Sequence, residues 1–176
     1  MDVTQTQVNS LIEDIAYLEH EADALKYVIE NVPYSQKPPA GRSIIETLLF
    51  LDHAQQEYYR KVIEDVFQST RPINLNSYTD PEETFEVDKD DSKDVQKVLY
   101  KISKHRAALL NLIRNIQLID WDRSIKKGKY DLSLYDFARE MVNRERRVLK
   151  EIADLVLTYQ NDKQVQRELE SRSQNG

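Results

Sequence analysis

Apolar residues recur at steps of three and four along almost the whole chain, and helix-breaking residues fall between the periodic stretches. This pattern predicts four helices, over about residues 3–31, 43–68, 92–119 and 133–160. Each helix carries an apolar stripe that is too hydrophobic to face water, so the helices should pack against one another. Only three glycines and 32% charged residues also favour long amphipathic helices over sheet. The sequence therefore predicts an all-α four-helix bundle.

The connection between the second and third helices is unusually long for a compact domain. From Ser69 to Asp91 the helical periodicity disappears, and prolines, asparagines and acidic residues take its place. A connection of this length can cross over along the bundle and return the chain to the end where the second helix began. The second and third helices should then run parallel, which gives an up-down-down-up topology.

The chain ends in a polar segment without a clear apolar stripe. We assign residues 1–160 to a single four-helix domain and expect the fourth helix to end near Gln160. Residues 161–176 are expected to form a polar, frayed C-terminal tail.

Charge and composition exclude several classes of function. The formal net charge of -6 argues against nucleic-acid binding, which needs clustered Lys and Arg that are not balanced by carboxylates. The absence of cysteine excludes disulfides, thiolate nucleophiles and Cys-ligated metals. No basic and apolar leader is visible, and no apolar run approaches the roughly 18 residues of a membrane span. These features predict a cytoplasmic protein that does not bind membranes.

Two segments resemble the DinB/YfiT-like family. The segment Arg-Ser-Ile-Ile-Glu-Thr-Leu, residues 42–48, is similar to the Trp-Ser-x-x-Glu-x-Leu opening that is common in the second helix of those proteins. Residues 135–137 and 143–152 are similar to the signature of the family's final helix. The long crossover also matches the family's topology. The resemblance covers most of the chain, and it implies a fold shared with metal-dependent thiol transferases and hydrolases that act on small electrophiles.

The resemblance also implies a place for a metal site. Members commonly hold a divalent metal with three histidines, one on the second helix and two, four residues apart, on the last. Carried onto this sequence, those positions are Phe50, Arg144 and Val148, and none of these side chains can ligate a metal. We therefore expect that the family metal site is lost and that the chain uses no cofactor.

The three histidines that the chain does contain fall away from the apolar stripes. His20, His53 and His105 are expected to be ordinary surface or boundary residues. A slip of one helical turn, which would make His53 a metal ligand, remains an alternative, although one imidazole without partners makes a poor site.

Polar residues interrupt the apolar stripes at one level of the bundle. Arg106 lies on the stripe of the third helix, and Glu145 lies on that of the fourth at the matching height, so we predict a buried Arg106–Glu145 ion pair. Gln55 lies at a similar height on the second helix. One interpretation is a polar layer that fixes the helix register; the other is a remnant ligand pocket in which arginine holds an anion. The candidate residues of this layer or pocket are Gln55, Tyr58, Arg106, Arg144 and Glu145, and the pocket interpretation adds Phe50.

Three hypotheses about function remain open. The first is a non-catalytic bundle, a homodimer, that acts by interaction or in a stress response; the sequence shows no catalytic triad, phosphate loop or carboxylate pair in a catalytic context. The second is a divalent-metal-dependent thiol transferase or hydrolase of the DinB/YfiT-like type. The third is a metal-free small-molecule binder that uses the polar layer.

Overall fold

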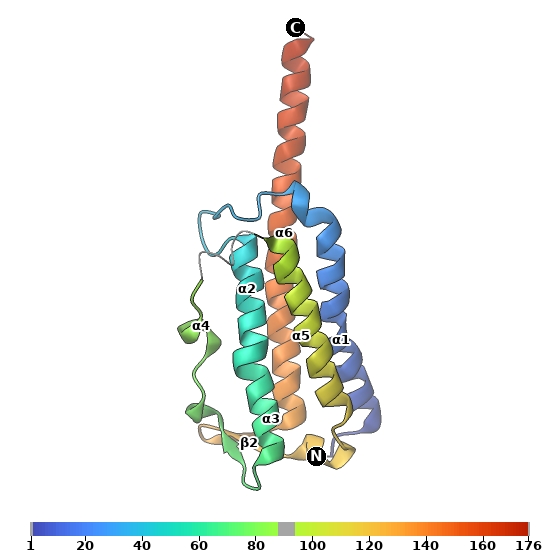
Figure 1. Cartoon of the computed structure of the whole chain (residues 1–176), viewed down its shortest axis with the longest axis vertical. Coiled ribbons are helices and arrows are strands. Elements are labelled where there is room, and N and C mark those ends of the chain that lie inside the picture. Colours follow the sequence, from blue (N-terminus) through green and yellow to red (C-terminus); the bar gives the residue numbers. More distant parts are fainter. Residues whose placement is uncertain (1, 88–93, 176) are drawn as a thin grey trace.

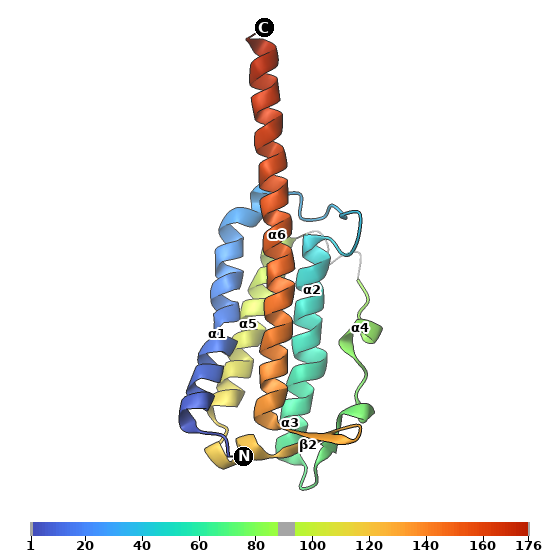
Figure 2. The same ribbon diagram turned by 180° about the vertical axis from the view of Figure 1, so that it is seen from behind.

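Four long helical segments form a bundle within residues 2–87 and 94–175, which the computed structural model describes (Figure 1). The chain runs up, down, down and up through them, and the first and last segments start at the same end (Figures 1 and 2). The predicted fold class and topology are confirmed. No helix in this described part is long and apolar enough to cross a membrane. The segments are α1 (Gln5–Val28), α2 with η2 and α3 (Ile44–Ala54, Gln55–Tyr59, Arg60–Gln68), α5 (Val95–Arg114) and α6 (Leu134–Gln174).

The helices start where their capping residues predict. Ser43 accepts a hydrogen bond from the Glu46 backbone N–H at 3.2 Å, and the Glu46 carboxylate accepts one from the Ser43 N–H at 3.3 Å. This reciprocal pair is a capping box, and it starts the second helix at residue 43 as the sequence predicted. Ser133 caps α6 by accepting from the Asp136 N–H at 3.0 Å, as expected for the fourth helix.

The third helix is shorter than the apolar periodicity predicted. Its expected first residue, Ser92, lies outside the described residues, and the helix N-cap is Asp94, whose carboxylate accepts from a backbone N–H in the first turn. The helix ends at Arg114 rather than near Ile119. A separate 3-10 turn, η5 (Leu118–Asp122), follows and places Trp121 in full burial at the bundle end.

The fourth helix is longer than predicted. We expected it to end near Gln160 and residues 161–176 to be frayed, but α6 continues to Gln174 and extends well beyond the other helices (Figures 1 and 2). Residues 161–174 contain no glycine or proline and are rich in Gln, Glu, Lys and Arg, which have high helix propensity. Intrinsic propensity therefore continues the helix without an apolar stripe. The single-domain assignment of residues 1–160 stays a prediction.

A small three-stranded sheet covers the bundle end where α3 stops and α6 begins (Figure 1). Its strands are β1 (Ile73–Asn74), β2 (Ser124–Lys127) and β3 (Tyr130–Ser133). β2 pairs parallel with β1 and antiparallel with β3, and Gly128 takes a positive φ of 62° in the hairpin turn. The sequence predicted only an irregular loop here.

The crossover follows the outside of α2 (Figure 1). After β1 it forms the short helices η3 (Leu75–Ser77) and α4 (Pro81–Thr84). Asp80 caps α4, and Glu82 forms an ion pair with Arg42 at 2.7 Å, which ties the crossover to the start of α2. The crossover thereby brings carboxylates to the side of the bundle between α2 and α6.

The interior contains two apolar clusters. One surrounds the half near β2 and includes Trp121 and Phe137, and the other surrounds the opposite half and includes Leu99 and Ile152. Buried polar side chains from α5, α6 and the second helical segment lie between these clusters.

Candidate functional site

The buried polar side chains between the clusters are Gln55, Arg106 and Glu145. Arg106 is fully buried and contacts Glu145 through a charge-assisted hydrogen bond, so the predicted ion pair is confirmed. Its Nε donates to the Gln55 side-chain oxygen at 3.0 Å, and its third nitrogen donates to the Ile15 carbonyl at 3.4 Å. We call the side chains of Gln55, Arg106 and Glu145 the polar layer.

The polar layer continues toward the surface through Asp52. Gln55 donates to the Asp52 carboxylate at 2.9 Å, and His105 contacts the same carboxylate through Nδ1 at 2.8 Å. Burial raises the pKa of the Glu145 carboxyl, and the adjacent Arg106 guanidinium opposes that shift. Each nitrogen of the Arg106 guanidinium already has a protein partner. These contacts therefore favour a structural role for the polar layer over a role as a ligand pocket.

Tyr58 does not join the polar layer. The apolar stripe placed Tyr58 toward the core, but the structure buries Tyr59 and leaves Tyr58 half-buried. The reason is the π-helical turn η2, whose hydrogen bonds span five residues instead of four, so that the residues after it are rotated about the helix axis. Gln55 begins this turn and Tyr59 ends it, so the π turn links the polar layer to the wall of a neighbouring pocket.

The three positions that the family resemblance assigns to metal ligands lie together. Phe50, Arg144 and Val148 line one pocket of about 630 Å³ between α2, α6 and the crossover. Their chemistry does not fit a metal, because a phenyl ring and an isopropyl group offer no lone pair and a guanidinium repels a cation. The Arg144 guanidinium instead lies 5.6 Å from the centre of the Phe50 ring, and that of Arg42 lies 4.4 Å from it.

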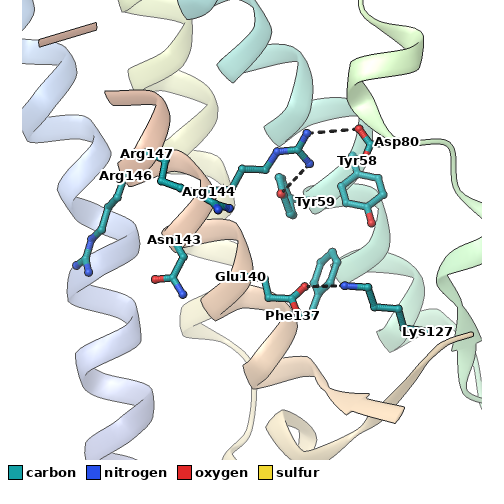
Figure 3. Close-up of a pocket in the computed structure, with 10 residues that line it drawn as sticks. All are labelled: Tyr58, Tyr59, Asp80, Lys127, Phe137, Glu140, Asn143, Arg144, Arg146 and Arg147. Atoms are coloured by element: carbon teal, nitrogen blue, oxygen red, sulfur yellow. Dashed lines mark hydrogen bonds and ion pairs between the residues drawn. The ribbon is translucent and has the colours of Figure 1, made fainter. Parts of the chain in front are cut away.

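Arg144 also borders a second pocket, of about 670 Å³, which lies nearer to the small sheet (Figure 3). Its guanidinium contacts Asp80 at 3.4 Å, the Tyr59 hydroxyl at 3.4 Å and Glu82 at 4.0 Å. We call this space the Arg144 pocket. Its lining residues are Tyr58, Tyr59, Asp80, Lys127, Phe137, Glu140, Asn143, Arg144, Arg146 and Arg147.

The histidines occupy surface or boundary positions, as predicted. His20 is exposed, and His53 and His105 are half-buried. The Nε2 atom of His53 contacts the Thr84 hydroxyl at 2.8 Å, which ties α2 to the crossover. Across residues 2–87 and 94–175, no group of three or more His, Cys, Asp or Glu side chains is placed to hold a metal ion.

The candidate residues therefore divide between two regions. Gln55, Arg106 and Glu145 form the polar layer, whereas Tyr58 and Arg144 line the Arg144 pocket. Sequence reasoning missed the crossover residue Asp80 at this pocket. A usable signal was present, because the acid-rich crossover and the basic run 144–150 have opposite charges.

Comparison of the fold with solved structures shows a clear likeness. YfiT from Bacillus subtilis, described as a probable metal-dependent hydrolase with an unusual four-helix bundle topology, matches with a TM-score of 0.70. The match has 14% sequence identity and covers 88% of each chain. At this identity the likeness shows a shared fold alone. No protein-family model matches the sequence, and no curated protein matches it.

Proposed function

We propose that this chain is a DinB/YfiT-like bundle that has lost the metal site implied by the resemblance. It acts by interaction or in a stress response rather than by catalysis. The observation that carries this proposal is the meeting of Phe50, Arg144 and Val148 in one pocket. The three positions come from separate motifs on two helices, yet they lie together in the structure. This supports the alignment of the family's motifs with this sequence. The side chains found there cannot hold a divalent cation.

The surroundings of Arg144 add an electrostatic argument. Its guanidinium contacts carboxylates of the crossover, so the positive charge at this place is part of the protein itself. A divalent cation at the same place would meet a like charge at close range in a partly desolvated site, which is unfavourable. The arrangement suits a neutral or anionic occupant.

The test is a restored histidine triad. The variant Phe50→His/Arg144→His/Val148→His should bind one Zn²⁺ or Ni²⁺ per chain in a calorimetric titration, whereas the wild-type protein should bind neither. A matched control, Phe50→His/Arg146→His/Lys150→His, has the same number of histidines, with its α6 pair at exposed positions that do not line this pocket. The control should bind at least about tenfold more weakly than the restored triad.

A metal-dependent thiol transferase or hydrolase remains the second candidate, and the likeness to YfiT is the observation that favours it. This candidate requires ligands other than Phe50, Arg144 and Val148. Stoichiometric divalent metal in wild-type protein purified without added metal would support this candidate and contradict our proposal.

The homodimer belongs to the same proposal. Light scattering coupled to size-exclusion chromatography should give a mass of twice 20.7 kDa. A mass of one chain over the whole concentration range would contradict this part of the proposal and leave the metal argument unaffected.

A further inference from the structure

Among residues 2–87 and 94–175, the partners of Arg144 are loose. Its contacts to Asp80 and Tyr59 are both 3.4 Å and that to Glu82 is 4.0 Å, longer than the roughly 2.7–2.9 Å of a strong charge-assisted hydrogen bond. By contrast, Arg42 binds Glu82 at 2.7 Å. The Arg144 guanidinium therefore has capacity for a closer, bidentate acceptor.

Asp80 is a weak competitor for that acceptor position. Its side chain is 52% exposed, and the same Oδ1 atom that faces Arg144 accepts the Glu82 backbone N–H at 2.9 Å. This carboxylate serves chiefly as the cap of α4. The Asp80 carboxylate beside Arg144 shows that the guanidinium can accommodate an oxyanion there. Because the contact between the two groups is long, another oxyanion can replace this carboxylate.

Positive charge gathers around the Arg144 pocket in a chain whose net charge is -6. Three of the four lining cations have acidic partners: Lys127 contacts Glu140 at 3.5 Å, Arg144 contacts Asp80 at 3.4 Å, and Arg146 turns toward α1 (Figure 3), where it forms an ion pair. No ion pair of Arg147 lies within residues 2–87 and 94–175. The four lining cations outnumber the two lining carboxylates, Asp80 and Glu140, so the pocket keeps a positive balance.

One wall of the Arg144 pocket is aromatic. The rings of Tyr58, Tyr59 and Phe137 lie 5.0–6.0 Å apart, measured between their centroids. Aromatic walls of this kind bind flat apolar groups by stacking or edge contacts. Burial also raises the pKa of the Tyr59 hydroxyl to about 12, so this hydroxyl keeps its proton at neutral pH and can donate it in a hydrogen bond.

We propose that the Arg144 pocket binds a small molecule that combines an oxyanion, either a carboxylate or a phosphate ester, with a flat apolar body. Arg144 and the Tyr59 hydroxyl donate to the oxyanion in place of Asp80, and Tyr58 and Phe137 contact the apolar body. The proposal rests on the proposed function, since it gives the chemical class of what a metal-free bundle binds.

The test is an NMR titration of the isotope-labelled full chain with phenyl phosphate, benzoate and inorganic phosphate at constant ionic strength. Phenyl phosphate, benzoate or both should shift the signals of Tyr58, Tyr59 and Arg144, and the better of the two should bind at least about fivefold more tightly than inorganic phosphate. Preference for phenyl phosphate assigns the site to phosphate esters, and preference for benzoate assigns it to carboxylates.

Three variants separate binding from structure. Arg144→Gln should weaken the binding of the better probe at least about tenfold, because the charge-assisted hydrogen bond between the guanidinium and the oxyanion is lost. Lys150→Gln removes one positive charge from the same helix at an exposed position that lines neither pocket, so binding should change by no more than about twofold. Asp80→Asn should tighten binding, because the competing carboxylate is removed, and an arginine with a purely structural role would not give this result.

The proposal is overturned if neither aromatic probe binds wild type or Asp80→Asn, or if inorganic phosphate binds as tightly as both. Metal analysis of the same samples keeps the two claims apart. Stoichiometric metal in wild type contradicts the proposed function, whereas metal-free protein that binds no probe contradicts only the oxyanion site.

Discussion

Arg106 and Arg144 lie on diagonally opposite helices of the bundle, α5 and α6, and they have opposite surroundings. Arg106 is fully buried, contacts Glu145 and Gln55 closely and lines neither pocket described above. Arg144 keeps 25% of its side chain exposed and lines both pockets, and within the described part of the chain its nearest polar partners lie at 3.4 Å. An arginine whose donors are already used stabilises one arrangement of helices, whereas an arginine with loose partners at a pocket is available to a ligand.

The largest effect should come from breaking the ion pair of the polar layer. Glu145→Leu leaves the buried Arg106 charge without its carboxylate, so the free energy of unfolding should fall by about 3–5 kcal/mol. Urea unfolding followed by circular dichroism measures this change. A loss below about 1 kcal/mol would show that Arg106 finds water or another partner, and that the two arginines differ less than we claim.

A smaller effect is expected at Gln55, which accepts from Arg106 Nε and donates to Asp52. Gln55→Leu removes one acceptor of Arg106 but keeps the ion pair, so the free energy of unfolding should fall by about 1–3 kcal/mol. The same denaturant titration measures it.

Replacing both members of the ion pair should be milder than replacing one. Arg106→Leu/Glu145→Leu removes both charges together with their desolvation penalty, and the double variant should unfold within about 1.5 kcal/mol of the wild type. A thermodynamic cycle with the single variants gives the coupling between the two residues. A double variant as unstable as Glu145→Leu would mean that the polar layer contributes through more than this pair.

The smallest effect on stability should come from Arg144. Its contacts are long and partly exposed, so Arg144→Gln should change the free energy of unfolding by less than about 1 kcal/mol. Thermal and urea unfolding both measure it. A loss as large as that of Glu145→Leu would identify Arg144 as a second structural arginine.

The polar layer could be predicted from sequence because it depends only on the helical periodicity and on the height of each residue along the bundle. A charged residue in the middle of an apolar stripe must face the interior, and the antiparallel directions of α5 and α6 place Arg106 and Glu145 at one height. The capping box at Ser43 and the length of the crossover are equally local signals. The fold follows from these local signals and their spacing.

The Arg144 pocket depends on contacts that spacing does not reveal. Asp80 reaches Arg144 from a crossover without helical periodicity, so nothing in the sequence sets its height along the bundle. The π turn directs Tyr59 rather than Tyr58 toward the core, and no residue type within the turn predicts a π-helical conformation. The sheet forms because Ile125 is fully buried beneath the bundle end, which is a tertiary effect.

The most direct test of the contrast between the two arginines is one binding measurement on two variants. The affinity of the better aromatic probe should be compared between Arg106→Leu/Glu145→Leu and Arg144→Gln, each confirmed as folded by circular dichroism. We predict that the double variant binds within about threefold of the wild type and that Arg144→Gln binds at least about tenfold more weakly. The reverse order, with binding lost in the double variant and kept in Arg144→Gln, would contradict the account.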